Sequence, residues 1–125
     1  MDFVLTDMAP RPGGHYSQAV VHNGLVYVAG QLPIVPGSDD RTPGPLEAQV
    51  RQALVNMLAV VEAAGSRPDL VIKVTIYVAD MEAWGLVNAI FAELFGSHKP
   101  ARAIVPCPPL HYGYGIEVDC IAALA

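Results

Sequence analysis

The sequence predicts an α+β fold in which two helices cover one face of a mixed β-sheet, with the element order ββαβαββ. Three observations lead to this prediction. Two short apolar runs flank an Asn-Gly pair near the N-terminus, two segments of helical period enclose one alternating segment, and two further strand-like runs follow near the C-terminus. The length of 125 residues suits one domain, so residues 1–125 are predicted to fold as a single unit.

The first two strands are predicted to form a hairpin over residues 19–22 and 25–30. Asn23 and Gly24 lie between them, and Asn-Gly is the strongest short hairpin signal because both residues tolerate a positive φ. Residues 1–14 end in a proline- and glycine-rich run and are expected to be an irregular lead-in. The sheet is therefore expected to open with the hairpin.

The first helix is predicted to begin at Leu46, after a loop. Residues 33–45 are rich in proline, glycine and aspartate, which regular structure does not tolerate. From Leu46 onward apolar residues recur with helical period, and Gly65 supplies the stop.

A strand and the second helix follow. Residues 70–78 alternate in character, which predicts a strand. Its inward face is expected to carry Ile72, Val74, Ile76 and Val78. Asp80 is expected to cap a helix over residues 82–95, which Gly96 ends. Trp84 belongs to the apolar stripe of this helix and is expected in the core.

The last third is predicted to form two strands, residues 101–105 and 115–123, around a proline-rich centre. If they pair as an antiparallel hairpin, Arg102 faces Glu117. Alternation then gives the sheet face away from the helices a mixed set, namely Lys73, Thr75, Tyr77, Arg102, Ile104, Glu117, Asp119 and Ile121. Such a face is too apolar for water and too polar for the core of a monomer, so we expect it to be buried against another copy of the chain.

Composition narrows the classes of function. Hydrophobic residues make up 53% of the chain and charged residues 15%, with a net charge of −5, a profile typical of neither disordered nor nucleic-acid-binding proteins. The N-terminus does not resemble an export signal, and no apolar run is long enough to span a membrane. Two cysteines without a paired motif favour a reducing compartment, so we expect a cytoplasmic protein.

The sequence has no motif typical of a metal site or a nucleotide cofactor. The four histidines are scattered singly, without the spacing of a metal site. The glycine-rich stretches do not have the spacing of a phosphate-binding loop. The sequence therefore predicts neither a metal nor a cofactor.

Arg102 and Glu117 are the leading candidates for chemistry. A guanidinium can bind a carboxylate through two parallel hydrogen bonds, although a structural salt bridge is the more common role of a single arginine. Glu117 flanks an apolar strand and would be costly to bury unpaired, so it either pairs with Arg102 or serves a site. Their predicted contact across two strands gives the functional and structural interpretations equal weight.

Other candidates are weaker when taken one by one. His15 and Tyr16 follow a flexible Gly-Gly, where a loop can cover a pocket, and residues 111–114 form a glycine-spaced aromatic loop. Asn88 is the one polar residue near the apolar stripe of the second helix. Cys107 lies between prolines with no base beside it, which disfavours a nucleophilic thiol. Ordinary structural roles explain each of them equally simply.

Four segments form a pattern when taken together. They are Gly-Gly-His-Tyr-Ser-Gln at residues 13–18, Val-Ala-Gly-Gln-Leu-Pro at 28–33, Leu-Val-Asn at 86–88, and Pro-Ala-Arg at 100–102 followed by Ile-Glu-Val-Asp-Cys-Ile-Ala at 116–122. In this order, and on the predicted elements, they resemble the Rid family, the RidA-type reactive-intermediate deaminases, also called the endoribonuclease L-PSP family. One segment alone would be a weak match, but the four together are specific.

The resemblance implies a chorismate-mutase-like fold that assembles as a homotrimer, with three pockets at the subunit clefts. Family members hydrolyse imines and enamines of amino acids to 2-oxo acids and ammonia without a cofactor. The resemblance further implies that Arg102 binds the carboxylate of an imino acid and that Glu117 orients the attacking water. The implied substrate-binding positions are Tyr16, Ala29, Gly30, Asn88, His111 and the main-chain N–H of Ile104.

Two departures from the family pattern leave a second function open. Ala29 replaces the family's common serine, so a hydroxyl contact is missing, and Ile104 replaces its common cysteine. Thiol-based switching therefore does not carry over to Cys107. The alternative is a protein of the same fold that binds 2-oxo acids or similar small metabolites without turnover, as a sensor or partner module.

Further expectations concern the pKa of Glu117, the size of the substrate and two activities that the chain is not expected to have. A nearby Arg102 should lower the pKa of Glu117 and keep it anionic. The loops at residues 36–45 and 111–114 suggest a substrate bulkier than the imines of alanine or 2-aminobutyrate. Chorismate mutase activity would need more cationic groups than the chain supplies, and ribonuclease activity has poor electrostatic support at this net charge.

Overall fold

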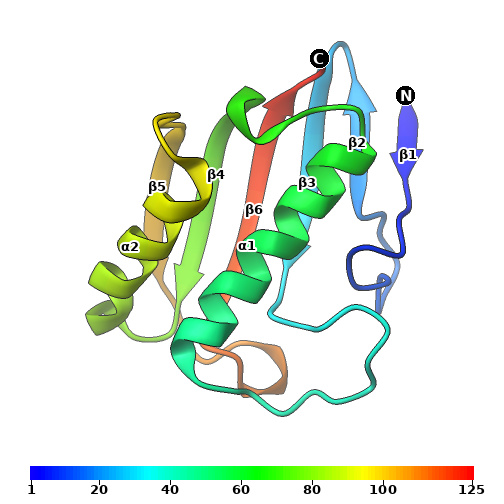
Figure 1. Ribbon diagram of the computed structural model, residues 1–125. Helices are drawn as coiled ribbons and strands as arrows, with labels where there is room; N and C mark the ends of the chain where they lie inside the picture. The colour runs from blue at the N-terminus through cyan, green and yellow to red at the C-terminus, as the bar shows by residue number, and fades with distance from the viewer.

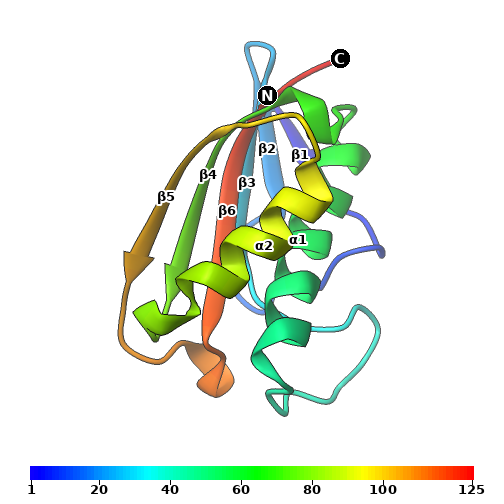
Figure 2. The same cartoon turned by 60° about the vertical axis from the view of Figure 1, so that its left-hand side comes forward.

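The computed structural model describes residues 1–125 and has two layers, a six-stranded sheet and two helices on one face of it (Figures 1 and 2). The strand order is β1-β2-β3-β6-β4-β5. The elements are β1 (Asp2–Val4), β2 (Ala19–His22), β3 (Leu25–Gln31), α1 (Leu46–Ala63), β4 (Val71–Val78), α2 (Trp84–Phe95), β5 (Ala101–Pro106) and β6 (Ile116–Ala123). The predicted α+β class, with both helices on one face of a mixed sheet, is confirmed.

The hairpin of β2 and β3 forms as predicted. Asn23 and Gly24 both have positive φ, 51° and 77°, which is the backbone conformation that a two-residue turn of this kind requires. The lead-in is less irregular than expected, because β1 pairs antiparallel with β2. Three residues are too few for an alternation pattern to be visible in the sequence.

The two helices begin and end close to the predicted positions. α1 runs from Leu46, and Gly65 just beyond it has φ 94°. Asp80 accepts a hydrogen bond from the main-chain N–H of Glu82 at 2.9 Å, which caps a short 3-10 turn that leads into α2. Gly96 follows α2 with φ 62°. Neither helix is both long enough and apolar enough to cross a membrane.

The core lies between the two helices and the sheet. Leu54 and Met57 of α1 are fully buried members of this core. In β6 burial alternates from Ile116 to Ala122, so one face packs on the helices and the other remains uncovered. In β4 the pairing shifts register between Val71 and Lys73. Val71 is therefore buried, whereas Ile72, which was predicted to face inward, is 47% exposed.

The predicted hairpin of β5 with β6 is wrong. β5 pairs parallel with β4 at the edge of the sheet, and β6 lies between β3 and β4, antiparallel to both. The physical reason is that α2 is a crossover connection, which returns the chain beside β4 in the same direction. Residues 107–115 then carry the chain past the end of β4 to the interior position of β6 (Figure 1).

This arrangement also corrects the placement of two predicted site residues. Arg102 is paired with Val74, and Ile104 with Ile76, so both lie on the face that the helices cover. Glu117 is paired with Tyr77 on the uncovered face. Within one chain, Arg102 and Glu117 therefore lie on opposite faces of the sheet rather than in cross-strand contact.

Candidate functional site

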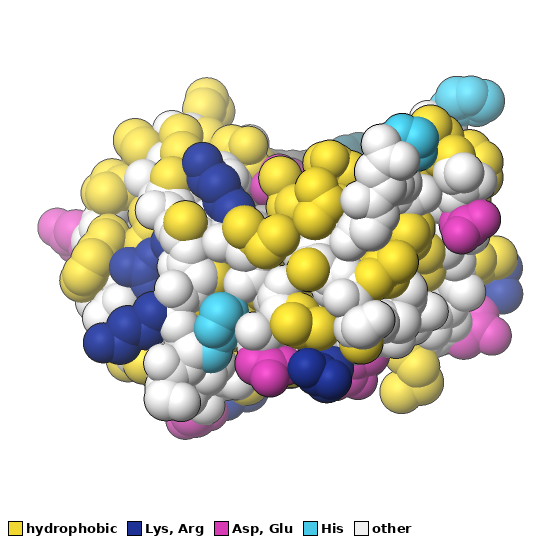
Figure 3. Space-filling model, turned by 90° about the horizontal axis from the view of Figure 1, so that it is seen from above, with side chains coloured by type: hydrophobic (Ala, Val, Ile, Leu, Met, Phe, Trp, Pro, Cys, Tyr) yellow, Lys and Arg dark blue, Asp and Glu magenta, His cyan; other side chains and the backbone are white.

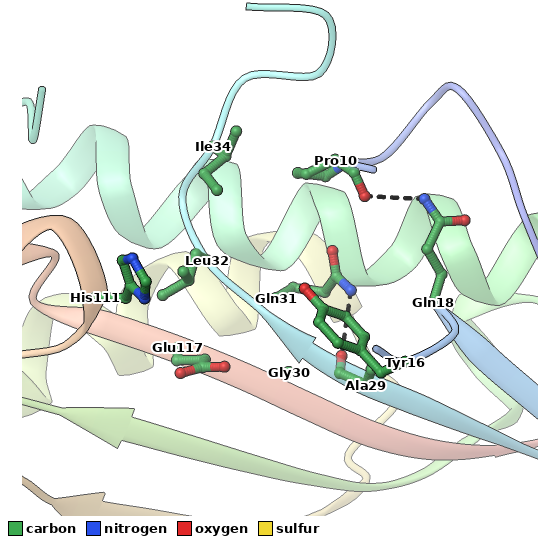
Figure 4. Close-up of a pocket in the computed structure, with 10 residues that line it drawn as sticks. All are labelled: Pro10, Tyr16, Gln18, Ala29, Gly30, Gln31, Leu32, Ile34, His111 and Glu117. Atoms are coloured by element: carbon green, nitrogen blue, oxygen red, sulfur yellow. Dashed lines mark hydrogen bonds between the residues drawn. The ribbon is translucent and has the colours of Figure 1, made fainter. Parts of the chain in front are cut away.

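A hollow of about 410 Å³ lies on the uncovered side of the sheet, where β3 and β6 adjoin the lead-in and the loop before β6 (Figure 4). Five of the predicted site residues line it, namely Tyr16, Ala29, Gly30, His111 and Glu117. The other lining residues are Pro10, Gln18, Gln31, Leu32 and Ile34. The hollow thus combines one carboxylate and one imidazole with apolar and amide groups.

A β-bulge in β3 shapes the floor of this hollow. Val28 is paired with Cys120 and Gln31 with Val118, so Ala29 and Gly30 together oppose one residue of β6. The Glu117 carboxylate lies directly over Gly30, because a Cβ atom built at Gly30 would collide with Oε2 of Glu117. A glycine is thus what lets the carboxylate approach the strand this closely.

The side chain of Gln18 holds the lead-in beside the hollow. It is 1% exposed, and its Oε1 accepts a hydrogen bond from the N–H of Thr6 at 2.7 Å. Its Nε2 donates to the carbonyl oxygens of Thr6 and Pro10, both at 3.0 Å. Tyr16, on the same segment, is 55% exposed, and its hydroxyl accepts a hydrogen bond from the N–H of Gly13 at 3.3 Å.

Asn56 fixes the opposite wall. This fully buried residue of α1 donates hydrogen bonds from Nδ2 to the carbonyl oxygens of Leu32 and Ile34, at 3.0 and 2.8 Å. Neither Gln18 nor Asn56 was among the predicted site residues. In the sequence, Asn56 is a polar residue at a position of helical period that faces the core, which could have indicated a structural hydrogen bond. For Gln18, the sequence offers only its position at the end of the Gly-Gly-His-Tyr-Ser-Gln segment.

Burial raises the pKa of Glu117 above the ordinary value for a glutamate, and the neighbouring Asp119 carboxylate raises it further. His111 acts in the opposite direction and lowers it. The expectation that Arg102 would lower this pKa is therefore wrong for the single chain, because Arg102 lies on the other face. Burial also raises the pKa of Asp119.

Arg102 belongs to a second hollow, of about 470 Å³, between α2 and the start of β5. Its Nη1 donates a hydrogen bond to Oδ1 of Asn88 at 3.0 Å. Its guanidinium lies 4.8 Å from the ring centroid of Phe91 and 5.7 Å from that of Trp84. Trp84, which was expected in the core, is 45% exposed and forms part of this surround.

The predicted site residues are therefore divided between two surfaces. The hollow over β3 and β6 contains the acid, and the hollow beside α2 contains the arginine and Asn88. Ile104 is half-buried against the core and lines neither hollow. No group of three or more His, Cys, Asp or Glu side chains forms a candidate metal site.

The fold and the carboxylate-bearing hollow define a class, the small α+β proteins of chorismate-mutase-like fold. Within that class, a sequence model described as Endoribonuclease L-PSP matches residues 6–124. The chain belongs to this family, which includes the RutC and RidA proteins, and the resemblance noted in the sequence is thereby confirmed.

Curated relatives cover nearly the whole chain. A RutC family protein of Pyrococcus horikoshii is 40% identical over 121 residues, 97% of this chain and 96% of the relative. A protein of Rattus norvegicus named 2-iminobutanoate/2-iminopropanoate deaminase is 37% identical over 119 residues, 95% of this chain and 87% of the relative.

Solved structures agree with the fold. A putative endoribonuclease of Thermotoga maritima superposes with a TM-score of 0.95 at 37% identity, covering 100% of this chain and 98% of that one. The structure of E. coli TdcF with bound serine superposes with a TM-score of 0.94 at 28% identity, covering 100% of both chains.

Proposed function

We propose that the protein hydrolyses 2-imino acids and their enamine tautomers to 2-oxo acids and ammonia. The observation that carries the proposal is the half-buried Glu117 carboxylate, held over Gly30 in a hollow with room for a small substrate. Relatives in the same family are named 2-iminobutanoate/2-iminopropanoate deaminase, which supports the same reaction class here.

The proposal includes a homotrimer in which a neighbouring copy supplies Arg102. Arg102 and Asn88 lie near the β5 edge of the sheet, on the other side from Glu117, so a single chain does not bring the arginine to the acid. The uncovered face carries exposed apolar groups such as Tyr27 and Val105 beside its charged residues. A surface of this kind favours association with another copy.

Figure 3 shows the mixed character of the surface at one end of the molecule. Hydrophobic side chains cover much of it, and several basic side chains lie on the left, the side of α2 and β5 in Figure 1, while acidic and other basic side chains lie elsewhere on the rim. Docking of the α2 and β5 side onto the acidic hollow of a neighbour would bring opposite charges together. We further propose a reducing, cytoplasmic location, with which the free thiols of Cys107 and Cys120 are compatible.

The mechanism follows from these groups. The Arg102 guanidinium of one copy binds the substrate carboxylate, which fixes the position of the C=N carbon relative to a water held by Glu117 of the next copy. Because burial raises the pKa of Glu117, this carboxylate is a better proton acceptor than a solvent-exposed glutamate. It takes a proton from the water as the water attacks the imine carbon.

The first test is Arg102→Ala. We expect it to lower the release of 2-oxo acid from freshly generated 2-aminoacrylate by roughly 100-fold, because the substrate carboxylate is no longer held. Arg67→Ala is a matched control, since Arg67 pairs only with the exposed Asp69. Normal turnover in Arg102→Ala, with the oligomer intact, would refute the proposal.

A second candidate is a non-catalytic protein that binds small carboxylates. Ala29 in place of the serine common in the family favours it, and E. coli TdcF was solved with bound serine, a small amino acid. Calorimetry with 2-oxobutyrate distinguishes the two. Binding of 2-oxobutyrate by a protein that does not accelerate imine hydrolysis would select the binding role.

A further inference from the structure

We propose that His111 is the general acid that protonates the departing nitrogen. This inference rests on the proposed function. Glu117 takes the proton from the attacking water, and a second group is needed to give a proton to the leaving nitrogen. His111 and Glu117 line the same hollow, and Figure 4 shows the imidazole on the Glu117 side of it, next to Leu32. The two side chains are close enough for the charge of His111 to act on the Glu117 carboxylate, and a general acid must reach the nitrogen bonded to the carbon that the water attacks.

The turn that carries His111 is firmly held. Gly113 donates a hydrogen bond to the carbonyl oxygen of Leu110 at 2.9 Å, and Leu110 donates to that of Tyr114 at 3.1 Å. Tyr114 is 2% exposed, so it anchors the turn in the interior. Tyr112 adopts a positive φ of 63°, and its ring lies 3.9 Å from the imidazole, centroid to centroid.

A second loop supports this turn from outside. Gln49 of α1 accepts a hydrogen bond from the N–H of Gly115 at 2.9 Å and donates one to the carbonyl oxygen of Gly44 at 2.8 Å. The Arg41 guanidinium lies 5.9 Å from the Tyr112 ring centroid. The loop before α1 and the turn before β6 are thus bound to one another, which positions the imidazole before substrate arrives.

The other three histidines do not have this relation to the hollow. Nε2 of His98 lies 2.7 Å from the carbonyl oxygen of Val71, which is a structural contact. His22 lies at the exposed end of the β2–β3 hairpin, and His15 lies in the exposed lead-in. His111 is the histidine that lines the hollow with Glu117.

The proton transfers balance with two groups. The substrate reacts as the protonated imine, C=NH2⁺. Water forms a bond to its carbon and loses a proton to Glu117, while the C=N π electrons move to the nitrogen and leave a neutral amino group. The His111 imidazolium donates its proton to that amino group, the C–N bond breaks, and its electron pair leaves with ammonia. The electron pair of the hydroxyl O–H bond becomes the second bond of the C=O group, and the hydroxyl proton returns to the imidazole. Glu117 then gives its proton to the ammonia, which departs as ammonium.

Several ionisable groups lie around the hollow that His111 lines. Glu117 and Asp119 share one face of β6, Tyr112 and Tyr114 belong to the same turn as His111, Arg41 lies beyond Tyr112, and Tyr16 faces the hollow from the lead-in. A proton donor in this position makes turnover decline as the pH rises and the donor is lost.

The experiment compares His111→Ala and His111→Gln with His22→Ala as the matched control. We expect both His111 variants to lose about 100-fold in turnover and the alkaline limb of the pH profile, with calorimetric binding of 2-oxobutyrate unchanged. Added imidazole should restore turnover to His111→Ala, which leaves space for it, but not to His111→Gln.

Two results would overturn the inference. One is turnover at the wild-type rate in both His111 variants. The other is loss of 2-oxobutyrate binding together with turnover, without rescue by imidazole, which would mean that His111 holds substrate or the turn instead of moving a proton. Wild-type protein without imine turnover would refute the proposed function itself, and so can be told apart from either result.

Discussion

The pKa of Glu117 is set by its own burial and by two neighbouring side chains, which act in opposite directions. Its own burial and the Asp119 carboxylate raise its pKa, and His111 lowers it. A carboxylate in this state accepts protons readily, and its activity is lost as the pH falls through its raised pKa. The acid limb of the pH profile should therefore follow the pKa of Glu117, which Asp119 raises and which Arg102 of a neighbouring copy lowers in the proposed trimer.

Asp119→Asn tests this electrostatic account. Removing the like charge lowers the pKa of Glu117, so the acid limb of kcat/KM should move to lower pH. The measurement is the pH profile of imine hydrolysis, with Asp2→Asn in the exposed strand β1 as the control. An acid limb that stays in place or moves to higher pH would contradict the role given to Asp119.

At the residue scale, the predicted site residues divide between two surfaces, and their roles in binding and catalysis remain predictions. Tyr16, Ala29, Gly30, His111 and Glu117 were predicted as site residues, and the structure brings them to one hollow. The contact of Arg102 with Glu117 was wrong, because it depended on a pairing between distant strands. Gln18 and Asn56 escaped notice since their roles lie in hydrogen bonds to main-chain groups.

The bulge in β3 is the element on which the acid depends. It places Ala29 and Gly30 opposite a single residue of β6, and the absence of a side chain at Gly30 makes room for the Glu117 carboxylate. The carboxylate is the mobile end of its side chain, so a methyl group at Gly30 would displace it without moving the strand.

Gly30→Ala should therefore lower turnover while leaving the fold intact. We expect turnover to fall about 10-fold, because a displaced carboxylate no longer holds the water in position to attack the imine carbon. Steady-state turnover and the urea midpoint are to be measured side by side. Gly85→Ala is the matched control, since a Cβ atom there meets open space. Unchanged turnover in Gly30→Ala would show that the carboxylate position is unimportant.

Local signals explain which elements could be predicted. The Asn23-Gly24 turn, Asp80 and Gly96 each act on neighbouring residues, and the hairpin and both helices were predicted close to their observed bounds. The order of strands is not local. Nothing in residues 101–123 shows that β5 runs parallel to β4 or that β6 inserts between β3 and β4. The pairing of β4 with β6 includes a register shift between Val71 and Lys73. For that reason Val71 faces inward, where Ile72 was predicted to do so.

The whole molecule has one covered and one uncovered sheet face, with half of the candidate site on each. The acid lies in the hollow over β3 and β6 (Figure 4), and the arginine lies beside α2. The sequence predicted that a mixed sheet face is buried against another copy, and the structure leaves a mixed face uncovered, although Arg102 and Ile104 lie on the opposite face. Under the proposed function, the same division gives association a chemical role, because a neighbouring copy would bring Arg102 to the Glu117 hollow.

Mixing two inactive variants tests this central claim most directly. Arg102→Ala and Glu117→Gln, each inactive alone, are to be unfolded and refolded together in equal amounts, and 2-oxo acid release is then measured. If Arg102 of one copy serves Glu117 of the next, every mixed trimer has one intact site, and about one quarter of wild-type turnover should return. If mixed trimers form and turnover stays absent, the site does not join two subunits and the account is wrong.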